Sequence, residues 1–379
     1  MKVLIAIDSF KGSISSAEGS KAISLGIKDV YPDAEIVAVP VADGGEGTVE
    51  ALVQATNGQF ITKEVTGPLK EKVKAVYGIL GEGETAVIEV AAACGLPLVP
   101  SDQRNPFITT TYGVGELISD AIEKGCHKFV IGLGGSSTND AGVGMLQALG
   151  FRFLDKNGQE VGLGGQVLQD ICKIDVTHVN PVLKDCTFEI ACDVQNPLYG
   201  PTGAAYVFAP QKGATAEMVR ELDEGLKHFA QVVLNELDVD IHNIVGGGAA
   251  GGLGAAFAGF LHAHLRSGIQ VVLDIIQMEE KIKGVDFVIT GEGLLDGQTS
   301  MGKAPIGVAQ LAYKHRIPVI ALAGGITNET SPLHASGITS CFSIVNKPMS
   351  LEEAMDYHVT FDNLRFTSYQ LFRLIRAIR

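Results

Sequence analysis

Residues 3–13 read VLIAIDSFKGS, and this stretch decides the fold. Its first five residues are apolar without interruption, which predicts a strand, and the polar residues after Ile7 predict a loop. Residues 13–29 follow with apolar side chains at helical spacing and with serines available to cap the helix start. A second strand at 35–39 and a second helix at 44–56 repeat the order. This alternation predicts parallel strands joined by right-handed crossovers, and therefore an α/β fold.

The same alternation returns after Lys283. The predicted elements there are a strand at 286–290, a helix at 305–314, a strand at 318–323, a short helix near Pro332 and a strand at 340–344. Together with the first two strands, they suit a doubly wound, flavodoxin-like or Rossmann-like parallel sheet.

The chain between these parts has a different pattern. Three β-rich runs at 60–65, 72–79 and 86–90 follow one another without helical spacers, which predicts an antiparallel meander. Further elements are predicted at 111–124 (helix), 128–133 (strand), 141–149 (helix), 187–192 (strand) and 214–237 (helix). We therefore predict a discontinuous doubly wound domain at 1–60 plus 285–379, an inserted α/β domain with a mixed sheet at 61–284, and an active site in the cleft between them.

Composition narrows the class of protein. The chain has 379 residues, of which 46% are hydrophobic and 19% charged, and this excludes disordered, collagen-like and coiled-coil chains. A net charge of −14 disfavours a nucleic-acid partner. The apolar run after Lys2 is too short for a signal peptide, and residues 246–261 are a poor candidate for a membrane span. Six cysteines without a C-x-x-C pair fit a reducing, cytoplasmic compartment.

Acidic and glycine residues occur together in the loops expected after three strands, at 8–13, 42–48 and 291–299. Ligands of open parallel sheets bind at the carboxyl ends of the strands, where these loops lie. Glycine lets backbone N–H groups approach a phosphate, and carboxylates serve as metal ligands or bases. A single loop of this kind is more often a tight turn capped by Asp or Ser, but three on one sheet edge favour a functional site.

Two further glycine-rich segments occur in the inserted part. Residues 132–140 read GLGGSSTND between a predicted strand and a predicted helix, which favours a phosphate loop with N–H donors and hydroxyls. Residues 246–254 contain a formal G-x-G-x-x-G, for which close helix packing is an equally good explanation.

Single residues add candidates. Residues 297–303 meet G-x-x-x-x-G-K, but Ala304 stands where a P-loop needs Ser or Thr, so Lys303 either neutralises a phosphate or is a solvated lysine at a helix start. Asp193 ends a predicted strand and is either a base or magnesium ligand or part of an Asx turn. No G-x-S-x-G elbow and no zinc-like histidine spacing occur, so a metal, if present, should be magnesium on carboxylates.

These segments, in this order, resemble the bacterial glycerate kinase family that phosphorylates D-glycerate with ATP. The resemblance rests on the segments 8–12, 42–48, 104–106 with 109–115, 132–140, 192–197, 208–213, 248–254, and 291–298 with 302–305. The last residues, 355–379, depart from the Ala-rich final helix expected of the family.

The resemblance implies transfer of the γ-phosphoryl group of ATP to glycerate, with Mg²⁺ bridging the phosphates. It implies phosphate charge from Lys11 and Lys303, and Asp193 and Asp296 as base or magnesium ligand. Arg104 would bind the glycerate carboxylate, or Arg104 is a surface side chain that caps a loop; Asp43, Ser9 and Glu292 are further candidates on the substrate side. Asp43, Glu46 and Glu292 also compete with Asp193 and Asp296 for the roles of base and magnesium ligand. Backbone contacts to the phosphates are expected from Gly134, Gly135, Ser136, Ser137, Thr138, Gly251, Gly252 and Gly254.

The implied product is 2-phosphoglycerate, and 3-phosphoglycerate stays open. A nicotinamide-dependent oxidoreductase of a small hydroxy acid is the first alternative, and a non-catalytic small-molecule sensor is the second. No nucleic acid or membrane partner is expected, and the oligomeric state is open.

Overall fold

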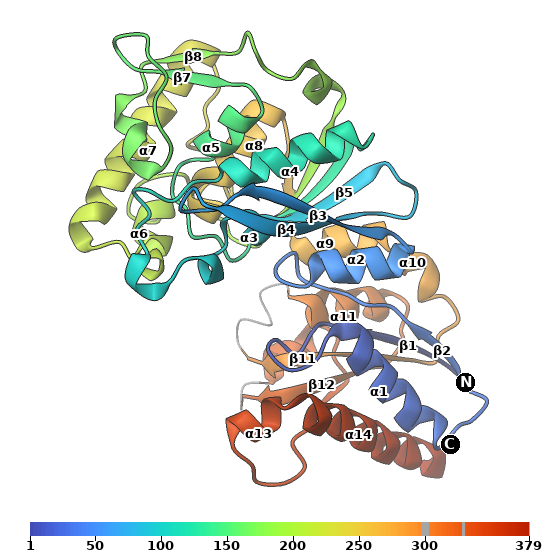
Figure 1. Cartoon of the computed structure of the whole chain (residues 1–379). Coiled ribbons are helices and arrows are strands. Elements are labelled where there is room, and N and C mark those ends of the chain that lie inside the picture. Colours follow the sequence, from blue (N-terminus) through green and yellow to red (C-terminus); the bar gives the residue numbers. More distant parts are fainter. Residues whose placement is uncertain (297–302, 328–329, 379) are drawn as a thin grey trace. The chain divides into compact units, whose positions relative to one another are not determined.

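A computed structural model describes residues 1–296, 303–327 and 330–378. The chain forms two compact units (Figure 1). Unit 1 comprises residues 1–43, 50–56 and 267–379, and unit 2 comprises residues 44–49 and 57–266.

Unit 1 is built on a parallel sheet of five strands in the order β13-β12-β11-β1-β2. The strands are β1 (Lys2–Ile7), β2 (Glu35–Ala38), β11 (Phe287–Leu295), β12 (Val319–Ile326) and β13 (Ser340–Ser343). Counted along the chain, this is the flavodoxin-like order 2-1-3-4-5, so the predicted α/β class and doubly wound sheet are confirmed. The strand order reverses between β1 and β11.

Strand β11 is longer than predicted. Residues 291–295, which were expected to belong to a loop, continue the strand because they pair with β12, Glu292 opposite Ala323 and Leu294 opposite Gly325. Glycine-rich sequence predicts a loop from local propensity alone, whereas here tertiary pairing overrides it.

Helices α1 (Ser16–Lys28) and α14 (Tyr357–Ile378) lie side by side in unit 1 (Figure 1). They approach closely at Gly26, where any Cβ would overlap the carbonyl oxygen of Arg365. Leu364 and Phe372 of α14 belong to the same buried cluster as the inner residues of β1. The atypical C-terminal segment is therefore a packed amphipathic helix.

The remaining helices of unit 1 are α2 (Thr48–Thr56, whose first two residues group with unit 2), α9 (Gly268–Ile275), α10 (Met278–Lys281), α11 (Ala304–Lys314), α12 (Ser331–Ala335) and α13 (Leu351–Met355). Helix α9 packs against α11 at Gly307, where a Cβ would overlap the side chain of Ile269. This contact is why the second segment of unit 1 begins at Ser267, earlier than residue 285.

Unit 2 contains a six-stranded mixed sheet in the order β10-β9-β6-β5-β4-β3. Its strands are β3 (Gln59–Thr66), β4 (Lys72–Ile79), β5 (Thr85–Glu89), β6 (Lys128–Gly132), β9 (Thr187–Ala191) and β10 (His264–Arg266). The predicted antiparallel meander forms β3, β4 and β5, and the other pairs are parallel. A separate hairpin joins β7 (Arg152–Leu154) to β8 (Lys173–Asp175).

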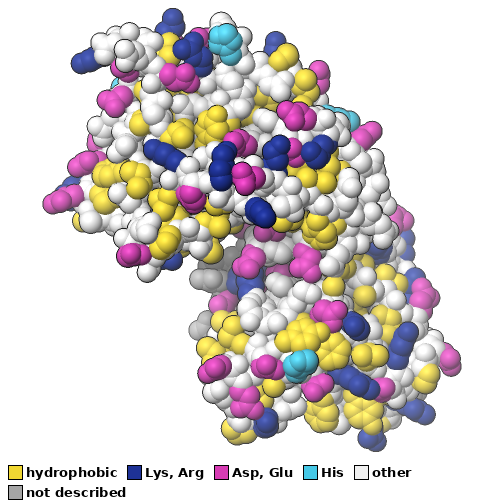
Figure 2. All heavy atoms as spheres, viewed as in Figure 1, with side chains coloured by type: hydrophobic (Ala, Val, Ile, Leu, Met, Phe, Trp, Pro, Cys, Tyr) yellow, Lys and Arg dark blue, Asp and Glu magenta, His cyan; other side chains and the backbone are white. Residues whose placement is uncertain are grey.

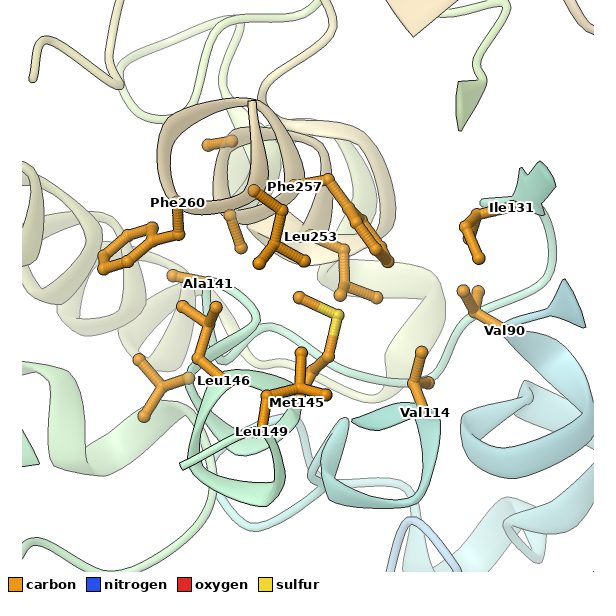
Figure 3. Close-up of a cluster of buried hydrophobic side chains, with 14 of the residues drawn as sticks. Val90, Val114, Ile131, Ala141, Met145, Leu146, Leu149, Leu253, Phe257 and Phe260 are labelled. Carbon is orange, nitrogen blue, oxygen red and sulfur yellow. The ribbon is translucent and has the colours of Figure 1, made fainter. Parts of the chain in front are cut away.

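The main helices of unit 2 are α3 (Ala91–Cys94), α4 (Tyr112–Glu123), α5 (Val143–Ala148), α6 (Ala204–Phe208), α7 (Ala216–Leu237) and α8 (Leu253–Leu261). In the core, Leu253, Phe257 and Phe260 of α8 face Met145 and its neighbours on α5 (Figure 3). Leu133 and Ala141, on either side of the glycine-rich loop at 134–140, belong to the same buried cluster.

Two surface properties bear on partners. Among the described residues, no helix is both long and apolar enough to cross a membrane. Figure 2 shows acidic and basic side chains interspersed on the face in view, unlike the basic stripe that follows a nucleic-acid backbone.

Candidate active site

The first group of candidate residues lies at the switch point of the unit 1 sheet. Asp8 directly follows β1, and its N–H donates to the carbonyl oxygen of Gly291 at 2.8 Å. Glu292 is the next residue of β11, one position beyond the last pair with β1. Parallel α/β sheets bind ligands at this position, outside the carboxyl ends of the strands.

Carboxylates and lysines alternate in this group. Lys11 Nζ lies 3.8 Å from Asp43 Oδ2, and Lys303 Nζ lies 3.9 Å from Glu292 Oε2. Asp8 is 2% exposed, and burial together with the negative charge of Asp43 raises its pKa to about 7. The Asp8 carboxyl group therefore changes protonation near neutral pH, a property that favours proton transfer.

Asp8 was not among the residues assigned a role from the sequence. The available signal was its position, the first acid after the fully buried strand β1. Its neighbour Ser9 donates its backbone N–H to Asp8 Oδ1 at 2.6 Å, so Ser9 holds this carboxyl group from the main chain. Gly293 lies beside the turn that carries Lys11, because a Cβ added at Gly293 would lie 3.9 Å from the backbone N atom of Lys11.

Asp296 is half-buried and directly follows β11. The G-x-x-x-x-G-K pattern begins one residue later, and residues 297–302 lie outside the described residues. Lys303 is described and forms the N-terminal boundary of α11.

The second group of candidate residues lies in unit 2, where residues 134–140 follow β6. Gly134 and Gly135 are exposed, and residues 136–140 are buried. Both the N–H and the hydroxyl of Ser137 donate to the Cys94 carbonyl oxygen at 2.9 Å, so Ser137 anchors the loop. The exposed turn at Gly134 and Gly135 is the part of the loop that a ligand can reach.

The predicted helix start after this loop is wrong by two residues. Helix α5 begins at Val143 because Ala141 and Gly142 adopt left-handed backbone conformations. The buried carboxylate of Asp140 accepts the N–H of Gly142 and the N–H and hydroxyl of Thr111. Burial raises the pKa of Asp140, which these donors oppose.

Lys212 is a functional candidate that sequence reasoning named only within a motif. It lies at the end of a 3-10 turn, Pro210–Lys212, and is 3% exposed. Its Nζ donates to Ser136 Oγ at 3.0 Å and to the Thr138 carbonyl oxygen at 2.7 Å. Burial lowers the pKa of Lys212 to about 8.

The glycines at 246–254 pack segments of unit 2 against one another. A Cβ on Gly251 would overlap the Thr138 carbonyl oxygen, and one on Gly252 would lie 2.6 Å from Ala141 Cα. Gly254 meets the backbone of Gly246 in the same way. These contacts support the packing explanation, and phosphate contacts by Gly251, Gly252 and Gly254 stay a prediction.

Two charged candidates border this group. Asp193 is exposed and follows β9, which pairs with β6, so Asp193 and the loop at 134–140 leave neighbouring strands at the same sheet edge. Arg104 lies against the turn after Lys212, since a Cβ on Gly213 would lie 2.7 Å from Arg104 Cβ. Its Nε is buried and has no hydrogen-bond partner.

Glu89 is a second residue that the sequence did not indicate. At the end of β5, its Oε1 accepts the backbone N–H of Val49 at 2.9 Å. A Cβ added at Gly134 would lie 3.2 Å from Gly45 Cα, so the two loops approach closely there. Glu89 therefore anchors the acidic, glycine-rich loop at 42–48 beside the exposed turn of the loop at 134–140.

The model of the glycerate kinase family matches residues 3–376. The chain belongs to the glycerate kinase family.

Relatives of this family member are similar over nearly the whole chain. It is 50% identical to the glycerate 2-kinase of Escherichia coli K12 over 96% of this chain and 95% of that protein. It is also 50% identical to the glycerate kinase of Bacillus subtilis 168, covering 94% of each chain. A crystal structure of a candidate glycerate kinase 2 from Salmonella typhimurium LT2 matches with a TM-score of 0.92 and 45% identity, over 100% of this chain and 98% of that chain.

This family membership makes the protein an enzyme, a kinase with an alcohol group as acceptor. It decides against the oxidoreductase and sensor alternatives. The structure agrees, because the formal fingerprint at Gly246 follows irregular chain, whereas a dinucleotide site needs a preceding strand.

The glycerate kinase family member has no three-ligand metal cluster of His, Cys, Asp or Glu among the residues that the structure describes. Mg²⁺ usually takes one or two protein carboxylates and completes its shell with phosphates and water. Asp296 in unit 1 follows β11 directly, and Asp193 in unit 2 stands two residues after the end of β9. Each carboxylate is a hard oxygen donor of the kind that suits a magnesium ion arriving with a nucleotide.

Proposed function

We propose that the protein transfers the γ-phosphoryl group of ATP to D-glycerate and produces 2-phosphoglycerate. The observation that carries this proposal is the cluster of Asp8, Lys11, Asp43 and Glu292 at the switch point of the unit 1 sheet. Lysines beside carboxylates suit a reaction in which phosphate charge must be stabilised and a hydroxyl must lose a proton. The names of the relatives support glycerate as the acceptor.

In unit 1, we assign Lys11 and Lys303 to the phosphate charge of the nucleotide. Lys11 is exposed and Lys303 is half-buried, so both can contact a ligand. Ser9, Asp43 and Glu292 then orient the acceptor hydroxyl and these lysines.

In unit 2, we assign the exposed turn at Gly134 and Gly135 to phosphate contacts through backbone N–H groups. Thr138 and Ser137 keep the loop in place from the buried side. Arg104 is assigned to the glycerate carboxylate, because a guanidinium group binds a carboxylate with two parallel hydrogen bonds.

Asp193 and Asp296 are the proposed magnesium ligands, and one of them accepts the proton of the substrate hydroxyl. When bound, Mg²⁺ neutralises the phosphate charge that develops during transfer. Asp193 is exposed, so its carboxylate is accessible to both ligands. A cytoplasmic location is supported by the six cysteines, all of which are free thiols.

A coupled assay with ATP, magnesium and D-glycerate, followed by phosphorus NMR of the product, tests the proposal. We expect ADP and 2-phosphoglycerate in equal amounts. A 3-phosphoglycerate signal would retain the kinase reaction and overturn the assigned hydroxyl. Absence of turnover with ATP, while another nucleoside triphosphate is used, would overturn the donor; absence of turnover with every donor would overturn glycerate as acceptor.

A further inference from the structure

Lys212 is a buried ammonium group whose hydrogen-bond acceptors are both neutral. The side chain is 3% exposed, and Nζ donates to the Ser136 hydroxyl at 3.0 Å and to the Thr138 carbonyl at 2.7 Å. Among the residues that the structure describes, Lys212 forms no ion pair with a carboxylate within 4.0 Å. Burying a charged group without an ionic partner costs desolvation free energy, and a bound anion would offset that cost.

The charged groups around Lys212 do not replace such a partner. Cys94 and Asp140 are the groups that act on its charge from a longer distance. Burial raises the pKa of the Cys94 thiol to about 12, so this thiol is uncharged at neutral pH. Both oxygens of Asp140 accept hydrogen bonds from the Thr111 and Gly142 segments, which directs this carboxylate to the loop backbone.

The surroundings of Lys212 contain further polar groups without partners. Asn139 belongs to the same loop, is 0% exposed, and neither its Oδ1 nor its Nδ2 has a hydrogen-bond partner. Arg104, which packs against Gly213, has an unpartnered buried Nε. Nearly all buried polar atoms in proteins are paired, so these three unpartnered atoms, two on Asn139 and one on Arg104, favour a ligand beside the loop and the turn that Lys212 joins.

The hydrogen bonds of Lys212 also control how the loop faces solvent. They hold the Thr138 carbonyl and the Ser136 hydroxyl toward the protein interior, directly after the exposed turn at Gly134 and Gly135. When the carbonyl oxygens of a loop point into the protein, its backbone N–H groups can point toward solvent and bind an anion. The loop and the ammonium group beneath it therefore attract the same type of ligand.

We propose that Lys212 is a positioning residue of an anion site at residues 134–139, where it orients the loop and supplies the positive charge that an anionic substrate group requires. This inference rests on the proposed function and adds to it a residue that had no assigned role. The carboxylate of D-glycerate and a phosphate of the nucleotide share the required chemistry. Binding measurements with each compound distinguish the two sources.

The affinity of the site for an anion should depend on pH, because it depends on the protonation of Lys212. Burial lowers its pKa to about 8, so the group is protonated below that pH and neutral above it. We expect the affinity for the anion to decrease as the pH rises from 7 to 9.5. The other titratable groups facing Lys212 are Cys94 and Asp140. Burial raises the pKa of the Cys94 thiol to about 12, above this range. Burial also raises the pKa of Asp140, which its five hydrogen bonds oppose.

The test is titration calorimetry of the full chain with D-glycerate, with magnesium-ATP and with inorganic phosphate. We compare the wild type with Lys212→Met, which keeps the length and removes the charge, and with Lys184→Met, an exposed lysine of the same unit, as the matched control. We expect Lys212→Met to weaken one of the three ligands about 10-fold or more at pH 7 and to abolish the pH dependence of its binding. Lys184→Met should bind like the wild type.

Ser136→Ala provides a second variant that keeps the charge and removes one acceptor. We expect a smaller loss, and we expect Ser136→Ala to add little in the Lys212→Met background, because both variants disturb the same contact. Circular dichroism confirms folding of each variant. Unchanged binding of all three ligands by folded Lys212→Met, or a pH dependence that persists in it, would overturn the proposal.

These binding measurements separate this inference from the proposed function. A wild-type protein that binds one of the anions but does not phosphorylate glycerate would contradict the proposed reaction and leave the role of Lys212 supported. A wild-type protein with full kinase activity and a Lys212→Met variant with unchanged affinities would contradict only the role of Lys212.

Discussion

The two units place candidate residues at the same kind of position, the carboxyl ends of parallel strands, but use opposite chemistry there. In unit 1, the carboxylates of Asp8, Asp43 and Glu292 gather beside two lysines. In unit 2, a buried lysine contacts a hydroxyl and a carbonyl within a glycine-rich loop. Burial and like charge raise the pKa of the Asp8 carboxyl group, and burial lowers that of the Lys212 ammonium group, so the two units bring the pKa of a titratable group toward neutral pH from opposite sides.

The topology of a parallel sheet determines where a site lies, whereas the residues that follow the strand ends determine its chemistry. Unit 1 suits a ligand that brings positive charge, such as a magnesium-bound nucleotide. Unit 2 suits a bare anion.

The proposed magnesium ligands provide the strongest test. We expect Asp193→Asn and Asp296→Asn each to lower kcat about 10²- to 10⁴-fold, because Asn keeps the size of the side chain and loses both its charge and its basicity. Steady-state kinetics with ATP and D-glycerate measure the effect. The exposed acids Asp185 and Asp33, changed to Asn, are the controls in units 2 and 1. If only one of the two variants loses activity, a carboxylate of only one unit takes part in the reaction.

Asp8 makes the stability of unit 1 depend on pH. Its pKa is about 7 in the folded protein and 3.8 ordinarily, so the folded state holds a proton that the unfolded state releases. The free energy of unfolding should therefore fall by an amount on the order of 4 kcal/mol between pH 4 and pH 7, and then level off.

We expect Asp8→Asn to flatten this dependence and to stabilise unit 1 at pH 8. Hydrogen exchange measured by mass spectrometry follows the amides of units 1 and 2 separately. Asp33→Asn, at an exposed position of unit 1, should leave the dependence intact. A pH dependence that is equal in the amides of both units would contradict the assignment to Asp8.

Gly251 tests the support of the loop in unit 2. Gly251→Ala and Gly83→Ala both place alanine at a positive φ, +70° and +82°, which costs about 1–2 kcal/mol. At Gly83 the Cβ meets no atom within 4 Å, whereas at Gly251 it would lie 2.6 Å from Asn139 Cα. We expect Gly251→Ala to lose about 1–3 kcal/mol more than Gly83→Ala in urea unfolding followed by circular dichroism. Equal losses would show that the loop does not need this contact.

Lys11 gives the smallest expected effect on stability. The residue is half-exposed, and its ion pair with Asp43 is long, at 3.8 Å. We expect Lys11→Met to change the free energy of unfolding by less than about 1 kcal/mol. The KM for ATP should nevertheless rise about 10-fold, since a charged hydrogen bond to phosphate is lost. An unchanged KM for ATP together with an increased KM for D-glycerate would overturn the assignment of Lys11 to the phosphates of the nucleotide.

Much of the fold follows from local sequence. The apolar run at 3–7, the alternation of strands and helices, and the meander at 60–90 were sufficient to predict an α/β protein with one parallel and one mixed sheet. The errors occur where local propensity was misleading. Residues 291–295 look like a loop, and they form part of β11 because β12 supplies hydrogen-bond partners.

The site was predicted less completely. The loops at 8–13, 42–48 and 132–140 were recognised from acids and glycines beside strand ends. Lys212 received no role, because nothing in its neighbours along the chain reveals that it is buried. Asp8 received none although its position directly after the apolar run at 3–7 was an available signal. Glu89 was missed because it anchors a segment that is distant in the sequence.

The sequence by itself determined which segments become strands, that these strands are parallel, and which loops carry carboxylates, glycines and lysines, since these properties depend on neighbouring residues. Only the tertiary structure decided that β11 lies beside β1, so that Glu292 meets Asp8, and that Lys212 reaches Ser136. The physical reason is that burial and long-range contact, which shift the pKa values of Asp8 and Lys212 toward neutrality, exist only once distant segments have packed together.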